Sequence, residues 1–325
     1  MVINVRFLFF DIECSNCFGG VGKMCEFGYV ITDENFKVIS ASDIPMSPGR
    51  GRGDRFHLRD RMEQEDVSLA YDEEFYYSQP ELPTHYEKIK DLMEKEDTIC
   101  FAYSASNDIR YLSDSCNKYH LPSFDYTCYD IQIMVANYLG TKGQMGLSNA
   151  AHQIVGPNAT VALNEHLSRD DAKLAMMVME AICTIKQINS KTLLEESDSA
   201  RINSIEFLKQ FHANKERKAE LDRARVYLLE QAKADEEKYK DGSFGGKRYS
   251  FSNKAYSSMQ ECAELIDTIH SCGGLYVKRF DNADLIIVKD ETGIELLKKK
   301  ISDENSHKLI LLSDLRKPKE GGEAS

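Results

Sequence analysis

The sequence predicts an α/β protein in which a mixed β-sheet is flanked by helices. Near the N-terminus, the apolar run Phe7–Phe10 leads straight into acidic residues, which is typical of a strand buried on both faces. Strands come first along the chain and then alternate with helices, the order expected of a mixed sheet. With 325 residues and 42% hydrophobic content, the chain can form one large core or two modest domains.

Residues 1–190 carry the strongest periodic patterns and form the first expected domain. Strands are predicted at 3–13, 27–32, 36–40 and 98–103, and helices at 83–95, 108–118, 129–139, 146–154 and 169–188. A turn at 33–35 joins two of the strands into a hairpin, and 45–60, rich in proline and glycine, is expected to be an irregular loop. The last helix is the most clearly amphipathic of these elements.

Residues 191–241 differ in composition and predict a charged helical linker. The segment 191–240 is rich in Lys, Glu, Arg, Ala and Leu and contains no proline or glycine. Glycines at 242, 245 and 246 then mark a boundary. Residues 242–318 read as a small α/β domain with the order β-α-β-β-α-β, and 319–325 as a loose polar tail.

Composition excludes several classes of protein. No stretch reaches the 18 or so apolar residues of a membrane span, and residues 1–10 lack the order of a signal peptide, so we expect a cytoplasmic protein. Nine cysteines, an odd number, read as thiols in a reducing compartment. Cys14 and Cys17 form a C-x-x-C with Cys25 nearby, but no second pair for a structural zinc is evident.

Asp11 and Glu13 follow the first apolar run with one residue between them. Residues two apart on a strand point to the same side, so both carboxylates should share one face and Ile12 the other. Two like charges beside a core repel, and a divalent cation compensates for them. The alternative is a strand that has simply reached solvent.

Further acids stand where helices are expected to begin. Asp108 follows the strand that ends at 103, Asp130 is the second residue of the helix predicted at 129–139, and Asp171 lies at the start of the helix at 169–188. Each has a plain alternative as a helix cap or a helix-dipole partner. For Asp171, a capping pair with Ser168 would be enough to explain it.

Taken together, these segments resemble the three motifs of the DEDDh 3′–5′ exonucleases, the family that contains the proofreading epsilon subunit of bacterial DNA polymerase III. The motifs are Asp11-x-Glu13 after an apolar run, Ala102-x-x-Ala105-x-x-Asp108, and His166-x4-Asp171 opening a helix. The resemblance covers about residues 5–188. The chain departs from the family at Tyr103-Ser104, where His-Asn is usual, and at Asn107, where an aromatic residue is usual.

The resemblance implies a ribonuclease-H-like fold and metal-dependent phosphodiester hydrolysis. It implies two Mg²⁺ or Mn²⁺ ions held by Asp11, Glu13, Asp108 and Asp171, which is consistent with the preference of these ions for hard oxygen ligands. His166 is implied as general base, since an imidazole titrates near neutral pH, and the alternative is that it only orients the attacking water. Ser15, Asn16 and Phe18 are implied candidates for contacts to the terminal nucleotide, and Glu26 either contributes to that pocket edge or is a strand-end charge.

The charge distribution favours a short nucleic-acid footprint. Residues 1–241 carry the whole net charge of −12, whereas a protein that grips long duplex DNA usually has a basic stripe. Arginines gather only in the loop segment, at Arg50, Arg52, Arg55, Arg59 and Arg61. A single-stranded end bound a few nucleotides at a time fits this charge better, and the alternative for the arginine-bearing loop is a mobile surface segment.

Residues 247–315 resemble a BRCT domain, a module that binds phosphopeptides, partner proteins or DNA ends. The resemblance rests on 247–253 as first strand, on Gly273-Gly274 after a helix and on the strand at 284–288. It implies Ser252 and either Lys298 or Lys299 as phosphate ligands. The family's usual glycine is Asn253 here and its late tryptophan is absent, so docking of a protein or DNA, or a structural cap, are the alternatives.

The leading hypothesis is therefore a 3′–5′ exonuclease acting on single-stranded DNA ends, with a role in DNA repair or replication and a protein partner at the BRCT-like domain. One alternative is an exoribonuclease of the same fold, because the motifs do not separate deoxyribose from ribose. The other is a scaffold that binds ends without cutting them and acts through the BRCT-like domain.

Overall fold

The structure is a computed structural model of the 325-residue chain. It describes residues 5–16, 22–50, 58–59, 66–67, 69–141, 143–161, 163–164, 166–234, 244, 246–252, 255–256, 258–299 and 301–315. Its contacts divide the chain into two compact units, Met1–Phe211 and His212–Ser325. Among the described residues, no helix combines the length and the apolarity that crossing a membrane requires.

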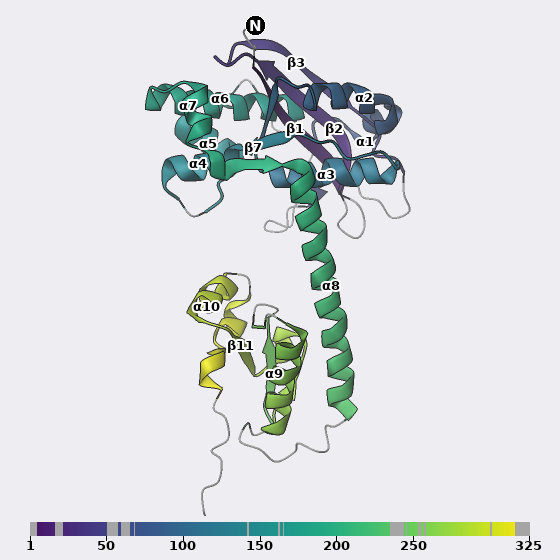
Figure 1. Ribbon diagram of the computed structural model, residues 1–325, viewed down its shortest axis with the longest axis vertical. Coiled ribbons are helices and arrows are strands. Elements are labelled where there is room, and N and C mark those ends of the chain that lie inside the picture. The colour runs from purple at the N-terminus through teal and green to yellow at the C-terminus, as the bar shows by residue number, and fades with distance from the viewer. Residues whose placement is uncertain are drawn as a thin grey trace, which may run out of the picture. The chain divides into compact units, whose positions relative to one another are not determined.

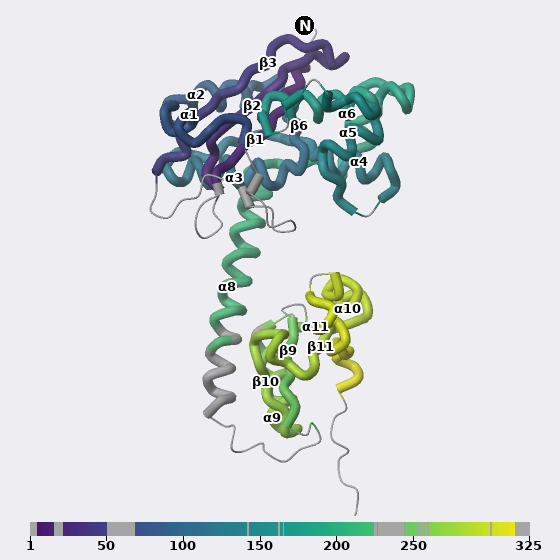
Figure 2. Tube along the Cα trace, turned by 180° about the vertical axis from the view of Figure 1, so that it is seen from behind, coloured from purple at the N-terminus to yellow at the C-terminus, as the bar shows by residue number. Residues whose placement is uncertain are grey.

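A six-stranded mixed sheet forms the centre of the first unit. Its strands are β1 (Arg6–Asn16), β2 (Gly22–Thr32), β3 (Val38–Pro45), β6 (Thr98–Ala102), β7 (Thr127–Asp130) and β8 (Arg201–Asn203). Their spatial order is β3-β2-β1-β6-β7-β8, with β1 between β2 and β6 (Figure 2). The strands β1, β2 and β3 pair antiparallel, β1, β6 and β7 pair parallel, and β8 is antiparallel to β7. The predicted mixed sheet flanked by helices is confirmed.

Strand β1 is buried on both faces because its apolar residues alternate between two cores. Leu8, Phe10 and Ile12 pack on one face with α2 (Leu82–Met93) and α3 (Ala105–Lys118). Phe7 and Phe9 pack on the other with α4 (Ile131–Leu139), α5 (Leu147–Ile154) and α6 (Ser168–Lys186). The two groups of helices lie on opposite sides of the sheet in Figure 1.

The remaining elements of the first unit are short, and one long helix that begins in this unit continues past Phe211 into the second. They are α1 (Glu73–Ser78), α7 (Ser190–Glu195), a 3₁₀ turn (Asp198–Ala200), the two-residue strands β4 (Leu58–Arg59) and β5 (Asp66–Val67), and α8 (Ser204–Ala234). Strand β3 continues to Pro45, and β4 and β5 pair with each other, so the segment expected to be wholly irregular carries some pairing.

The span 191–203, which the sequence places in the charged linker, contributes α7 and the sixth strand β8. Three residues are too few to show a strand period, and β8 is held largely by backbone pairing to β7 and by Ile202 against the core. The next residue, Ser204, exchanges hydrogen bonds with the backbone of Tyr126, which ties the start of α8 to the sheet.

The second unit contains a four-stranded parallel sheet with the order β10-β9-β11-β12. Its elements are β9 (Arg248–Phe251), α9 (Met259–Ser271), β10 (Leu275–Tyr276), β11 (Leu285–Val288), α10 (Glu291–Lys298), α11 (Asp303–Ser306) and β12 (Leu309–Leu311), with 3₁₀ turns at Phe280–Asn282 and Leu312–Asp314. The expected β-α-β-β-α-β order is present, with α11 added. Gly273 adopts φ +78° just after α9, where a left-handed residue ends the helix.

Candidate metal and catalytic site

Asp11 and Glu13 lie on the face of β1 that carries Phe7 and Phe9 and that α6 covers. Ile12 between them packs into the opposite core, as the strand alternation predicts. Glu13 is buried and Asp11 partly buried. The pairing of β1 with β2 shifts register just after Glu13, so the site lies beside a local irregularity of the sheet.

Asp108 reaches the site from the first turn of α3. Ser104, the residue just before α3, adopts a left-handed conformation (φ +65°), and its backbone N–H donates to Oδ1 of Asp130 at 3.2 Å. Asp130 also caps α4, accepting from the N–H groups of Gln132 and Ile133, so its expected role as a cap is present and it ties two helix starts together. Asp108 is buried.

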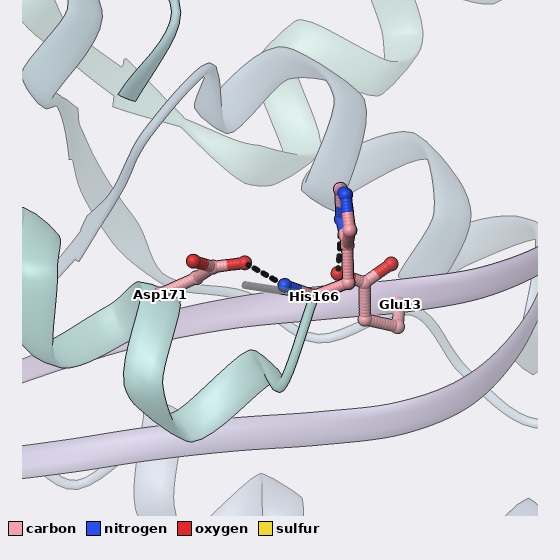
Figure 3. Close-up of side chains that lie close together, drawn as sticks. All are labelled: Glu13, His166 and Asp171. Carbon is pink, nitrogen blue, oxygen red and sulfur yellow. Dashed lines mark hydrogen bonds and ion pairs between the residues drawn. The ribbon is translucent and has the colours of Figure 1, made fainter. Parts of the chain in front are cut away.

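His166 and Asp171 come from the residues that lead into α6. The backbone N–H of His166 donates to Oδ2 of Asp171 at 3.3 Å, and its ring Nδ1 lies 3.7 Å from Oε1 of Glu13 (Figure 3). His166 adopts φ +65°, which turns the chain sharply before the helix. One ligand atom from each of Glu13, His166 and Asp171 lies within 4.8 Å of the others.

The capping pair of Ser168 with Asp171, weighed from the sequence, is wrong. The cap position of α6 is Leu167, which offers no side-chain hydrogen bond. The hydroxyl of Ser168 donates instead to Oε1 of the buried Glu26 at 2.6 Å. The carboxylate of Asp171 accepts from the backbone N–H of His166, so it faces the His166 side of the site.

The electrostatics of the site favour a cation. Burial raises the pKa of Asp11 well above its usual value, and the charges of Asp108, Glu13 and Asp171 raise it further. The pKa of Asp108 is raised by burial first and then by Asp130 and Glu13. Burial also raises the pKa of Glu13, against the hydrogen bond and charge of His166, which lower it.

These raised values mean that several carboxylates destabilise one another in their charged forms. A divalent cation would remove that repulsion, and the donor set of Asp11, Glu13, Asp108 and Asp171 offers only hard carboxylate oxygens, the type that Mg²⁺ and Mn²⁺ prefer. The residues present therefore fit the implied metal ions. The partly exposed His166 ring, 39% accessible, lies at the edge of this group, where solvent reaches it.

The other predicted contact residues are only partly described. Ser15 is buried and its hydroxyl donates to the backbone oxygen of Lys23. Asn16 ends β1, but its side chain and the whole of Phe18 lie outside the described residues, as do Arg52, Arg55, Arg61 and the side chain of Arg59. Arg50 lies 4.5 Å from the ring centre of Tyr77. Asn107 is exposed and donates to the hydroxyl of Ser104, so it adds no aromatic surface beside Asp108.

The start of α6 rests on residues that the sequence patterns did not single out. Gly28 lies under this turn, since a Cβ there would stand 2.0 Å from the backbone nitrogen of Arg169. Asp43 in β3 accepts a hydrogen bond from that nitrogen at 2.8 Å. Glu26, whose role the sequence left open, also contacts the start of α6, where it accepts hydrogen bonds from Ser168. A polar residue within an otherwise apolar strand, as Glu26 is in 24–31, was the available signal.

In the second unit, Ser252 lines a cavity of about 460 Å³ together with Val288, Lys289, Thr292 and Leu296. The lysine of this lining is Lys289, from the residue after β11. The predicted phosphate ligand Lys298 and its neighbour Lys299 lie at the exposed end of α10 and do not belong to the lining.

Comparisons with known proteins find similarity in solved structures alone, because no family model and no curated protein matches the chain. A 3′-exonuclease in the 3′-end specific recognition of histone mRNA stem-loop is 12% identical over 57% of this chain and 64% of its own, with a TM-score of 0.43. The chain thus spans less than two thirds of that protein. The nuclease domain of 3′hExo, a DEDDh family member bound to rAMP, is 14% identical over 57% of this chain and 93% of its own (TM-score 0.43). Exonuclease I of E. coli with a dA16 oligonucleotide is 12% identical over 55% of this chain and 41% of its own (TM-score 0.42).

Proposed function

We propose that the first unit is a metal-dependent 3′–5′ exonuclease that removes nucleotides from the 3′ ends of single-stranded DNA. The observation that carries the proposal is the convergence of Glu13, His166 and Asp171, from segments about 150 residues apart, next to Asp11 and Asp108. A strand that merely reached solvent would not gather four buried or half-buried carboxylates whose charges oppose one another.

In this proposal Asp11, Glu13, Asp108 and Asp171 hold two Mg²⁺ or Mn²⁺ ions. The ions would supply charge stabilisation to the phosphate and to the attacking and leaving oxygens of the hydrolysed bond. His166 takes the proton from the attacking water, and its partial exposure lets the proton pass on to solvent. Glu13, 3.7 Å from Nδ1, orients the ring and stabilises its protonated form.

The acidic character of the unit supports a short substrate segment over a long duplex. Asp43, Asp170 and Glu26 add carboxylates around the start of α6, and Arg169 is paired with both Asp43 and Asp170. Binding would then rest mainly on the metal ions at the chain end. DNA is the leading substrate, and RNA is the alternative that the same site geometry serves.

We further propose that the second unit is a BRCT-like docking module. Support comes from its parallel sheet order and from the cavity at Ser252, with Lys289 as the cation that lines it. A cytoplasmic location fits the described cysteines, which are buried and are not joined in disulfides.

The test is a degradation assay with purified protein. Single-stranded DNA and RNA of one sequence, labelled at either end, are incubated with Mg²⁺, Mn²⁺ or EDTA, beside Asp11→Ala and an exposed control, Glu180→Ala in α6. We expect stepwise, metal-dependent shortening from the 3′ end that Asp11→Ala abolishes and Glu180→Ala retains. The ratio of DNA to RNA cleavage decides the substrate. Binding of ends without cleavage under all these conditions would contradict the enzyme and support the scaffold.

A further inference from the structure

Glu26 is a fully buried carboxylate directly beside the proposed site. It lies in β2 as the pairing partner of Glu13 in β1, and residues opposite each other in an antiparallel pair share one face. Its exposed fraction is 0%. A buried carboxylate is costly unless hydrogen bonds compensate, so its partners reveal what it is for.

Both carboxylate oxygens of Glu26 accept short hydrogen bonds. Oε1 accepts from the backbone N–H of Ser168 at 2.9 Å and from its hydroxyl at 2.6 Å. Oε2 accepts from the hydroxyl of Tyr76 at 2.6 Å. These donors come from two different elements, α6 and α1. Both oxygens of Glu26 therefore accept hydrogen bonds, whereas the oxygens of a metal ligand would point at the cation.

The contacts fall on the first turn of α6, which has no side-chain cap of its own. The first backbone N–H groups of a helix lack partners within the helix. Here Ser168 donates to Glu26, and Arg169 donates to Asp43 at 2.8 Å. Two carboxylates from β2 and β3 therefore satisfy the helix start from outside, and their charge complements the helix dipole.

We propose that Glu26 is a positioning residue that holds the His166–Asp171 segment against the strand carrying Glu13. Ser168 lies two residues after His166 and three before Asp171, so fixing its backbone and hydroxyl fixes where both side chains emerge. Tyr76 holds the second oxygen and prevents the carboxylate from turning towards the site. The inference rests on the proposed function, because it assigns Glu26 a role in that same site.

The two substitutions Glu26→Gln and Glu26→Ala separate positioning from metal ligation. A glutamine can keep the arrangement, since its oxygen can accept both bonds from Ser168 and its amide can donate to the Tyr76 oxygen. Alanine removes all three bonds. If Glu26 is a positioning residue, Glu26→Gln should retain activity within a few-fold and Glu26→Ala should lose it. If Glu26 were a metal ligand, both variants should lose activity.

The experiment measures kcat, the Mn²⁺ concentration for half-maximal activity and, separately, Mn²⁺ binding by electron paramagnetic resonance. For Glu26→Ala we expect a loss of ~10–100-fold in kcat or metal affinity, the range seen when groups that orient ligands are removed. Ser168→Ala, which keeps the backbone donor, should lie between Glu26→Ala and the parent. Glu180→Ala, exposed on the same helix, should match the parent.

Hydrogen exchange of the segment 166–171 adds a readout that does not need activity and shows whether Glu26→Ala remains folded elsewhere. Faster exchange confined to this segment in Ala, with parent-like exchange in Gln, supports the proposal. The proposal is overturned if Glu26→Gln and Glu26→Ala lose activity equally. It is also overturned if Glu26→Ala and Ser168→Ala both behave like the parent. In either case the parent is still an active enzyme, so the proposed function stands. If the parent binds Mn²⁺ but cleaves nothing, the proposed function fails. The role of Glu26 is then decided by the Mn²⁺ affinity of the variants and by hydrogen exchange of the segment 166–171. A parent that neither binds Mn²⁺ nor cleaves overturns both.

Discussion

The ring nitrogen Nδ1 of His166 lies 3.7 Å from Oε1 of Glu13, and the backbone N–H of the same histidine donates to Asp171. One residue is thereby held by two of the proposed metal ligands, through its ring and through its backbone. Because the backbone contact does not depend on the side chain, replacing the ring should leave the loop before α6 in place.

This arrangement predicts that His166→Ala and His166→Gln lower kcat by ~10²–10⁴-fold, the range for loss of a general base. Mn²⁺ affinity should change little, because the carboxylates remain. Single-turnover cleavage and Mn²⁺ titration on the same preparations check both statements. A loss of Mn²⁺ affinity as large as that of Asp11→Ala would mean that the imidazole acts as a ligand.

The buried carboxylates predict an unusual pH dependence of stability. In the folded protein the pKa values of Asp11, Asp108 and Glu13 stand above their ordinary values of 3.8 and 4.5, and that of Asp43 is raised to about 6 by burial and Glu26. The folded state therefore binds these protons more tightly than the unfolded state. Their contribution is most favourable below the ordinary values and is lost as the pH rises through the raised ones.

A divalent cation replaces those protons, so it should stabilise the protein most where the carboxylates are charged. We expect Mn²⁺ to raise Tm more at pH 8 than at pH 5. Thermal unfolding at four pH values, with Mn²⁺ or EDTA, measures this. The metal-free Asp11→Asn variant supplies the internal comparison, since its Tm advantage over the parent should grow with pH. An advantage that shrinks as the pH rises would contradict the assigned direction of the shift.

Asp108→Asn should separate stability from activity. The substitution removes a buried charge that Asp130 and Glu13 oppose, while the amide oxygen can still accept the backbone hydrogen bonds of Asp108 and Ile12. We expect the metal-free protein at pH 7.5 to gain in Tm, at ~2–4 °C for each kcal/mol gained in a unit of this size, and cleavage to be abolished. Asp114→Asn, later in α3, is the matched control and should change neither quantity.

Parallel measurements of Tm and of cleavage on Asp108→Asn decide the point. A lower Tm in the absence of metal would show that the carboxylate contributes to folding by itself. Full activity would remove Asp108 from the site.

The sequence predicted four of the six strands of the central sheet, at 3–13, 27–32, 36–40 and 98–103, because each of them leaves a local pattern, whereas β7 and β8 were not predicted. The run Phe7–Phe10 alternates between two cores, so strand and burial follow from composition alone. Asp11 and Glu13 share a face by strand geometry. The meeting of Glu13 with His166, by contrast, followed from a resemblance between motifs, since no local rule relates residues so far apart in sequence.

What the sequence could not provide were contacts that depend on packing between elements. The hydroxyl of Ser168 was expected to cap α6, but it donates instead to the buried carboxylate of Glu26 in β2 at 2.6 Å. Strand β8 is three residues long and is specified by its neighbour β7. The lysine that lines the Ser252 cavity is Lys289, because the chain leaving β11 passes that cavity while the end of α10 points to solvent.

Gly28 is the position at which the sheet and the site are most directly joined. A Cβ there would stand 2.0 Å from the backbone nitrogen of Arg169 and 2.1 Å from the carbonyl carbon of Ser168. Backbone cannot yield as a flexible side chain can, so Gly28→Ala must push the start of α6 away from β2. We expect a loss of ~1–3 kcal/mol in the free energy of unfolding, the usual cost of overpacking.

The displacement should also lengthen the hydrogen bonds to Glu26 and Asp43 and move His166 and Asp171 from Glu13. Gly28→Ala should therefore lose Mn²⁺ affinity and kcat even at temperatures where it is fully folded. Gly143→Ala, where an added Cβ meets nothing within 4 Å, is the control and should match the parent in urea unfolding and cleavage. If Gly28→Ala lost stability but kept the parent's kcat and Mn²⁺ affinity when folded, the position of α6 on β2 would not govern the geometry of the site.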